Sequence, residues 1–216
     1  MSKPKLISFK LCPYVQRSVI LLKEKGVDYD IEYIDVYDPP EWFLALSPTG
    51  KVPILQIEDT VLFESAVINE YLDEVYTPAL HPSSQIQKAQ NRAWMEFTSP
   101  MYMDTFNIMM ATDKESSDNA VDSMNKNLAG LDIAMKKSPW FNGEAFSLVD
   151  ISAAPLFTRL DFYKSHCGLD LLKAFPNLQM WSDGLLVRQS VIESKVDGFD
   201  DMLLIRMEKI GTHINQ

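Results

Sequence analysis

A cysteine followed directly by a proline stands near the start of the chain. Cys12 comes after a short apolar segment and before a segment with helical spacing, and Pro13 suits the first position of a helix. We therefore expect Cys12 at the N-cap, where its sulfur faces unpaired backbone amides at the positive end of the helix dipole. Such an environment lowers the pKa of a thiol, which predicts a catalytic nucleophile. The alternative is a small, buried, apolar cysteine.

The second cysteine lacks these signals. Cys167 precedes Gly168 near a predicted helix end and has no activating neighbour in the sequence, so we interpret it as structural. The two cysteines are far apart, with no CxxC motif and no Cys/His spacing suited to zinc. Neither a structural disulfide nor a bound metal is expected.

Two dipeptides have the chemistry to bind a peptide-like ligand. Val52-Pro53 opens a predicted strand, and a cis bond there would leave the amide and carbonyl of Val52 free to pair with a bound peptide. An ordinary edge-strand proline is the alternative. Glu64-Ser65 stands where a strand ends and a helix begins, so Ser65 offers its hydroxyl and helix amides to a carboxylate. Glu64 can bind an ammonium group, although the same dipeptide is common as a plain helix cap.

The elements that must position these residues alternate over the first third of the chain. Apolar periodicity and turn residues predict the order strand, helix, strand, helix, strand, strand, helix. The strands are expected over 6–9, 30–36, 52–57 and 61–63, and the helices over 13–25, 41–46 and 65–75. This order is that of an α/β thioredoxin-like N-terminal domain, which we place at residues 1–77.

The rest of the chain is predicted to be helical. Periodicity is lost over residues 76–84, which hold Pro78 and Pro82, so the linker is placed there. Helical spacing then covers roughly 84–112, 116–137, 147–164, 176–189 and 199–209. An all-α helical bundle is expected as the C-terminal domain over residues 85–216.

Two features of the helical part invite interpretation. Ser147 and Asp150 form a variant of the capping box, flanked by the apolar pair Phe146 and Ile151, and we interpret this as a folding device. A stretch rich in methionine and aromatic residues, 94–110, is apolar on more than one face. Most of it belongs to a core, but Tyr102 and Phe106 are candidates for a cleft that binds an apolar second substrate.

Composition limits the partners. The chain has 216 residues and a formal net charge of -10, which argues against a nucleic-acid partner and an anionic membrane surface. An anionic small ligand can still bind where local donors outweigh the overall field. The N-terminus has no apolar signal region and no run of 18 apolar residues follows, so a cytoplasmic location is expected.

Together the motifs resemble the glutathione transferase superfamily over essentially the whole chain, and the Cys-Pro-Tyr start resembles its cysteine-type, omega-like members. The motifs are LCPYVQR (11–17), KVPIL (51–55), FESA (63–66), YLDE (71–74), FSLVD (146–150) and PNLQMW (176–181). The resemblance implies that Cys12 forms a mixed disulfide with glutathione. It also implies that Val52, beside Pro53, pairs with the cysteinyl backbone, and that Glu64 and Ser65 hold the γ-glutamyl end.

Four further positions bear on this resemblance. Lys51 is a candidate for the glycyl carboxylate, although omega-type enzymes carry a lysine where this chain has Pro39. Tyr14 is expected to pack its ring on glutathione or the core, and its hydroxyl is the rival activator to Cys12. Val15 replaces the second cysteine of glutaredoxins, so the site is monothiol. Arg17 could raise the local positive potential, but a structural ion pair is its expected role.

The resemblance implies a glutathione-dependent thiol transferase or reductase of the dehydroascorbate reductase type. Its substrates would be disulfides or small electrophiles, with glutathione as co-substrate, no metal, and a homodimer as the common assembly. One alternative is a conjugating transferase in which glutathione itself attacks the electrophile. The other is a non-catalytic binding protein associated with transcription machinery, although such proteins often lack the cysteine or the Glu-Ser pair.

Overall fold

The first part of the chain folds around a mixed sheet, as the alternation of strand and helix signals predicts. In the computed structural model, residues 2–135 and 138–215 are described, and they form a four-stranded sheet in the order β2-β1-β3-β4. The strands are β1 (Lys5–Ser8), β2 (Asp30–Tyr33), β3 (Ile54–Ile57) and β4 (Thr60–Phe63). β1 runs parallel to β2 and antiparallel to β3, and β4 is antiparallel to β3.

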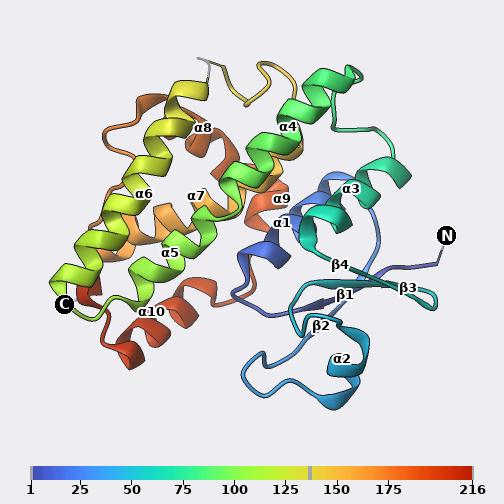
Figure 1. Cartoon of the computed structure of the whole chain (residues 1–216), viewed down its shortest axis with the longest axis horizontal. Coiled ribbons are helices and arrows are strands. Elements are labelled where there is room, and N and C mark those ends of the chain that lie inside the picture. The colour runs from blue at the N-terminus through green and yellow to red at the C-terminus, as the bar shows by residue number, and fades with distance from the viewer. Residues whose placement is uncertain (1, 136–137, 216) are drawn as a thin grey trace.

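Helices cover both faces of this sheet, because the side chains of its central strands alternate between two apolar faces. Leu6 and Leu55, which are paired across β1 and β3, belong to the larger core with α1 (Pro13–Glu24) and α3 (Ser65–Val75). Ile7 and Ile54 point to the opposite face, where they pack with Phe43 of α2 (Glu41–Leu46). Figure 1 shows the sheet between α2 and the pair α1 and α3.

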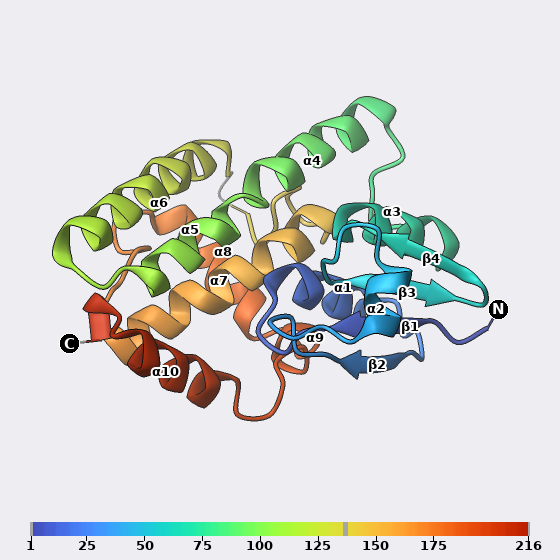
Figure 2. The ribbon, with the colours of Figure 1, turned by 60° about the horizontal axis from the view of Figure 1, so that its bottom comes forward.

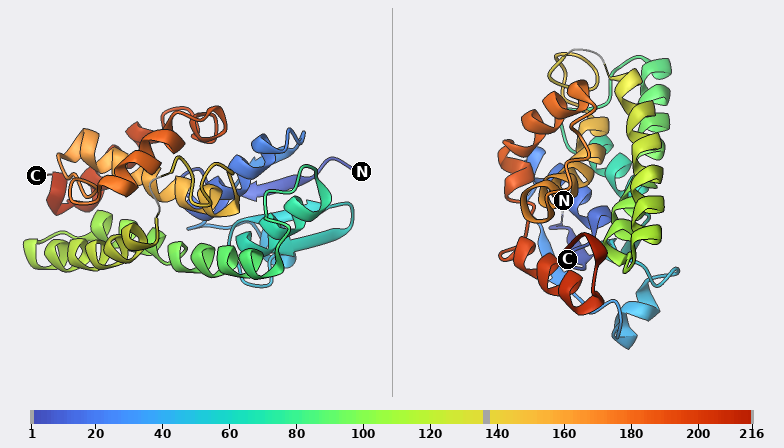
Figure 3. Two further views of the ribbon diagram at one scale, coloured as in Figure 1. Left: turned by 90° about the horizontal axis from the view of Figure 1, so that it is seen from above. Right: turned by 90° about the vertical axis from the view of Figure 1, so that its left-hand side faces the viewer.

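The helical part follows the linker. Its helices are α4 (Gln85–Thr98), α5 (Met101–Met110), α6 (Lys114–Ala134), α7 (Leu148–Cys167), α8 (Pro176–Leu186), α9 (Gln189–Ile192) and α10 (Phe199–Ile210). In Figure 3, α4 to α6 lie in one layer and the later helices in another. Figure 2 shows α7 reaching α1, and these two helices are in contact. None of the described helices is both long and apolar enough to cross a membrane.

Two helix predictions need correction. The single helix predicted over 84–112 is wrong, because Ser99 ends α4 and Pro100 is the N-cap of α5. Proline has no N–H to continue a helix, and its ring clashes with the preceding turn, so the break is local. The helix predicted over 116–137 is α6, which begins at Lys114 and ends at Ala134; residues 136 and 137 lie outside the described residues.

The predicted capping box at the start of α7 is confirmed. Asp150 accepts hydrogen bonds from the backbone amide and the hydroxyl of Ser147, both at 2.8 Å. The same carboxylate, which is fully buried, also accepts from Trp181 Nε1 at 2.7 Å and from the Phe141 amide at 2.8 Å. Asp150 therefore joins α7 to α8 and to the preceding loop, and its role is structural.

Candidate active site

The sequence-predicted site residues converge on one cavity between the sheet part and the helical part. Its volume is about 710 Å³. The sheet part contributes Cys12, Tyr14, Lys51, Val52, Pro53, Glu64 and Ser65, and the helical part contributes Tyr102 and Phe106. Segments up to about 90 residues apart in the sequence thus line one cavity, which is large enough for a tripeptide and a second small molecule.

Cys12 occupies the predicted position at the beginning of α1. It is the N-cap with an extended backbone, and Pro13 follows as the first helical residue. The Cys12 carbonyl accepts the first helical hydrogen bond, from the Gln16 amide at 3.0 Å. The half-buried thiol donates to the Val52 carbonyl, with an Sγ to O distance of 4.0 Å. The sulfur therefore lies between the helix start and the backbone of Val52.

The prediction of a lowered thiol pKa is wrong. Burial raises the pKa of Cys12, because removing a thiolate from water is costly. The amides of Val15 and Tyr14 and the guanidinium groups of Arg159 and Arg17 act in the opposite direction but do not outweigh burial. The helix start therefore favours the thiolate as expected, while the enclosing cavity has the larger effect.

The expected ion pair of Arg17 is also absent among the described residues. Arg17 is only 3% exposed, yet it contacts neutral acceptors. Its Nε and Nη2 donate to the Ser65 hydroxyl at 3.0 and 2.6 Å, and its Nη1 donates to the Ser152 hydroxyl at 3.4 Å. The oxygen of Ser65 is thus occupied as an acceptor, and its proton is left to donate toward the cavity.

Arg159 is a site residue that the sequence analysis missed. It lies on α7, is 5% exposed and lines the cavity. Its Nη2 donates to the Leu11 carbonyl at 2.7 Å, and its Nη1 donates to Gln16 Oε1 and to the Pro155 carbonyl, both at 2.8 Å. Burial lowers the pKa of Arg159, and it has no carboxylate partner in the described part of the chain. Arg159 is the one charged residue within 151–160, and this was the available signal.

The predicted anchors for a peptide come from the sheet part. The Val52-Pro53 peptide bond is cis, as predicted, and the described residues offer no backbone partner to the Val52 amide. Glu64 is an exposed N-cap with a positive φ of 65°, which is unusual for a residue other than glycine and is often kept for function. Lys51 is exposed and forms no ion pair with any described residue.

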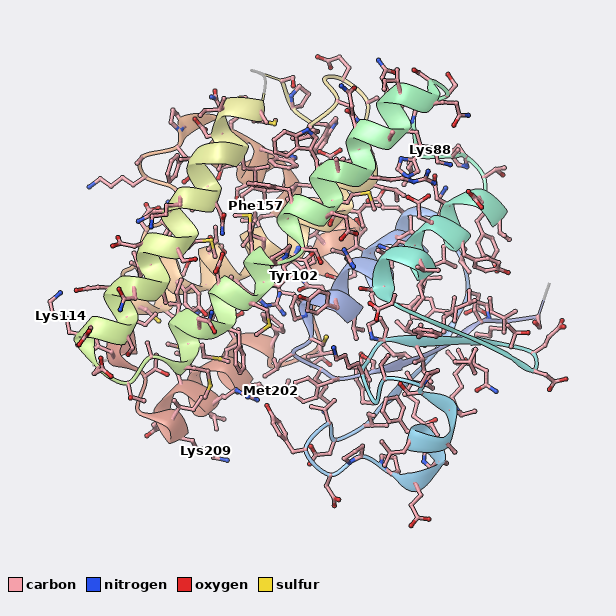
Figure 4. The ribbon with its side chains drawn as sticks, viewed as in Figure 1. Lys88, Tyr102, Lys114, Phe157, Met202 and Lys209 are labelled. Atoms are coloured by element: carbon pink, nitrogen blue, oxygen red, sulfur yellow. The ribbon has the colours of Figure 1, made fainter. Side chains whose placement is uncertain are left out.

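The aromatic candidates differ in what they can reach. The hydroxyl of Tyr14 donates to the Ser99 carbonyl at 3.3 Å, and its ring packs edge-on against Tyr102 with 4.9 Å between centroids. Tyr102 projects from α5, is 1% exposed and donates its hydroxyl to the Ser152 carbonyl, so it supports the wall (Figure 4). Phe106, at 37% exposure, presents its ring to the cavity.

The structure adds lining residues that the sequence did not single out. From the sheet part these include Phe9, Tyr37 and Thr49, and from the helical part Met103, Met109, Phe162, Leu203 and Arg206. Most of these residues are apolar, and those of the helical part come from α5, α7 and α10. Met103 and Met109 lie in the stretch 94–110 that the sequence analysis picked out, whereas the others are spread along the chain without a local pattern.

Comparison with known proteins agrees with this arrangement. Residues 11–75 match the family described as "Glutathione S-transferase, N-terminal domain", and residues 114–184 match "Glutathione S-transferase, C-terminal domain". The chain is 30% identical over 181 residues to glutathione S-transferase omega-1 of Rattus norvegicus, covering 82% of this chain and 74% of the relative. It is 29% identical to "Probable glutathione S-transferase DHAR1, cytosolic" of Oryza sativa, covering 85% and 84%.

A solved structure shares the whole fold. The glutathione transferase Omega 3C of Trametes versicolor superposes with a TM-score of 0.80 at 28% identity, covering 91% of this chain and 90% of that one. The predicted α/β thioredoxin-like domain followed by helices is confirmed by these matches. The chain belongs to the glutathione S-transferase family and is an enzyme of its cysteine-type, omega-like group.

Proposed function

We propose that this enzyme uses glutathione to reduce disulfides and related small oxidants such as dehydroascorbate, with Cys12 as the nucleophile. The main support is the position of the sulfur, 4.0 Å from the Val52 carbonyl. If the Val52 backbone pairs with the cysteinyl residue of glutathione, the two sulfur atoms are brought together. The thiol-transfer reaction then needs no further group to carry the glutathionyl unit.

Glutathione would be held along the sheet side of the cavity. Glu64 would bind its ammonium group, and the Ser65 hydroxyl, which Arg17 already contacts, would donate to the γ-glutamyl carboxylate. The first amides of α3 point toward the same carboxylate and add a partial positive charge. Lys51 is the proposed contact for the glycyl carboxylate, because it lines the cavity and has no competing carboxylate among the described residues.

Turnover would follow two thiol-disulfide exchanges. The Cys12 thiolate attacks the glutathionyl sulfur of a mixed disulfide, a Cys12–glutathione disulfide forms, and the other thiol leaves with a proton from solvent. The thiolate of a second glutathione then attacks the glutathionyl sulfur of this intermediate. Glutathione disulfide leaves, and the Cys12 thiolate is regenerated. Arg159 and Arg17 stabilise the negative sulfur at the start and end of this cycle.

Conjugation is the rival function, in which Tyr14 would activate bound glutathione. The Tyr14 hydroxyl donates to the Ser99 carbonyl, and burial raises the pKa of this tyrosine. The hydroxyl is thus already used as a donor, and its raised pKa makes it a weaker donor to a thiolate.

The test compares single cysteine variants on one glutathione mixed disulfide. Cys12→Ser should lose at least about a thousandfold in turnover, because a serine hydroxyl is scarcely ionised and cannot form a disulfide. Cys167→Ser is the matched control and should keep wild-type turnover. Mass spectrometry of the wild type after oxidised glutathione should find one glutathionyl group on Cys12. Full activity in Cys12→Ser together with its loss in Tyr14→Phe would show that glutathione activated by Tyr14, as in the conjugating mechanism, is the nucleophile.

A further inference from the structure

Arg206 of α10 lines the cavity, and part of its guanidinium has no partner among the described residues. Its guanidinium stacks on two aromatic rings, with its central carbon 5.2 Å from the Tyr37 centroid and 5.9 Å from the Phe106 centroid. Its Nη2 donates to the Tyr37 hydroxyl, a contact that joins the helical part to the loop after β2. Its Nε is screened from water and has no hydrogen-bond partner among the described residues, whereas its Nη1 is not screened and forms no hydrogen bond with them. Nη1 is therefore the donor that a ligand can reach.

The charged residues that line the cavity favour an anionic ligand for Arg206. The charged lining residues are Lys51, Arg159 and Arg206 with positive charge and Glu64 with negative charge, in a chain whose net charge is -10. A locally cationic cavity in an acidic protein concentrates anions where its walls exclude water. Arg206 pairs with no carboxylate in the described part of the chain, so its charge is available to a ligand.

The other two cations have other roles. Arg159 already donates to Leu11, Gln16 and Pro155 beside Cys12. Lys51 belongs to the sheet side, where glutathione is proposed to bind. Arg206 stands on α10 in the helical part (Figure 1), which also contributes the apolar lining residues Phe106 and Phe162. We therefore assign it to the half of the substrate that is not glutathione.

We propose that Arg206 determines specificity by binding a carboxylate on the second substrate. The preferred substrates are then glutathione mixed disulfides whose other half carries an acidic group. A guanidinium suits this task because it is planar, always charged and offers parallel donors to a carboxylate. The stacking on Tyr37 and Phe106 holds it in place before the substrate arrives, which reduces the entropy lost on binding. This inference rests on the proposed thiol-transfer function.

The test uses three mixed disulfides of glutathione that differ only at the distal group. Their partners are 3-mercaptopropionate (anionic), 2-mercaptoethanol (neutral) and cysteamine (cationic). We expect wild-type kcat/KM to be about tenfold higher for the anionic than for the neutral compound, and lowest for the cationic one. In Arg206→Gln the ratio of anionic to neutral should fall to about one, and Arg206→Lys should restore part of it.

Lys209→Gln is the matched control, because it removes one positive charge from the same helix. Lys209 is exposed and points away from the protein (Figure 4). The anionic-to-neutral ratio of this variant should equal that of the wild type. A ratio near one in the wild type, or an unchanged ratio in Arg206→Gln, would overturn the assignment of Arg206 and leave the Cys12 mechanism intact.

A binding experiment separates this inference from the chemistry. S-(2-carboxyethyl)glutathione and S-propylglutathione are thioethers of similar size that cannot be reduced, and calorimetry measures their affinities without turnover. The carboxyl compound should bind about tenfold more tightly to the wild type but not to Arg206→Gln. If this difference is found while no disulfide is reduced, the proposed function is wrong and the role of Arg206 stands. If the two thioethers bind equally well to the wild type, the role of Arg206 is refuted.

Discussion

Two regions of this molecule bury charged side chains, and they differ in whether the charge has a counter-ion among the described residues. Around the linker, Lys25 and Asp73 are 1% and 2% exposed and form an ion pair with 2.6 Å between Nζ and Oδ1. Asp73 also accepts from the amides of Leu80 and His81, at 2.7 and 3.2 Å. Around Cys12, the similarly buried Arg17 and Arg159 contact only neutral acceptors among the described residues.

This difference distinguishes a structural charge from one kept for a ligand. A buried charge without a counter-ion costs several kcal/mol of desolvation that neutral hydrogen bonds offset only in part. Where the charge has only to hold the linker in place, the fold supplies a carboxylate. On the proposed function, the negative partner beside Cys12 is the thiolate or a ligand carboxylate, and stability is given up to leave room for it.

Breaking the paired region should have the largest effect. Asp73→Ala leaves the buried ammonium of Lys25 with only the carbonyls of Tyr76 and Pro78 and removes the acceptor of two linker amides. We expect a loss of about 3 to 5 kcal/mol in the free energy of unfolding, measured with urea. Asp118→Ala is the control, because Lys114 and Asp118 form an exposed pair that contributes about 0.5 kcal/mol or less. A loss below about 1 kcal/mol in Asp73→Ala would show that the buried pair contributes little more than the exposed one.

A second prediction concerns acid stability in the same region. Partial burial opposes ionisation of Glu70, but hydrogen bonds from His81 at 2.7 Å and from Arg92 at 2.5 Å hold its pKa at about 2. The folded pKa lies below the unfolded one, so this stabilisation is present above about pH 4.5 and is lost as the pH falls toward 2.

Glu70→Gln should therefore lower the free energy of unfolding by roughly 1 to 3 kcal/mol at neutral pH, and the difference from wild type should shrink below about pH 4. Urea unfolding over a pH series measures this. Glu74→Gln is the control, since Glu74 is 62% exposed and its contact with Lys88 is 3.5 Å. A constant difference between Glu70→Gln and wild type down to pH 2 would show that the carboxylate is not the source of the stabilisation.

A change in the region around Cys12, where the buried arginines have no carboxylate partner among the described residues, should affect glutathione affinity. Ser65→Ala removes the hydroxyl that stands between Arg17 and the proposed γ-glutamyl carboxylate. We expect glutathione affinity to fall by roughly 1 to 2 kcal/mol, measured by calorimetry, as for a lost hydrogen bond to a charged group. Ser84→Ala, which removes the cap of α4 far from the cavity, should leave the affinity unchanged. Equal affinities for Ser65→Ala and wild type would place the carboxylate elsewhere.

The smallest expected effect is on the thiol itself. Arg159→Met removes a cation that opposes the effect of burial on Cys12, so the Cys12 pKa should rise further. Because only the thiolate reacts, alkylation of Cys12 by iodoacetamide at pH 7 should slow roughly threefold to tenfold. The increase of this rate with pH should also move to higher pH. Cys167, whose pKa is raised by burial alone, is the internal control in peptide mapping. An unchanged Cys12 rate would show that Arg159 does not act on the sulfur.

The local sequence was sufficient for much of this protein. Helices α2 and α3 have the predicted limits, Glu41–Leu46 and Ser65–Val75, and Cys12 caps α1 as Pro13 indicated. These features depend on proline geometry, turn residues and apolar spacing within a few residues, which the sequence displays directly. The helix break at Pro100 was equally local, but the apolar periodicity on both sides concealed it.

Only the tertiary structure decided the direction of the Cys12 pKa shift and the partners of the buried charged side chains. Burial of Cys12 depends on Val52, which is 40 residues away, and Arg159 reaches the Leu11 carbonyl across 148 residues. The cost of removing a charge from water depends on everything that surrounds it in space, and so does the identity of its partners. The sequence could therefore place Cys12 at a helix start, but whether burial or the neighbouring cations dominate its pKa followed from how distant segments pack around it.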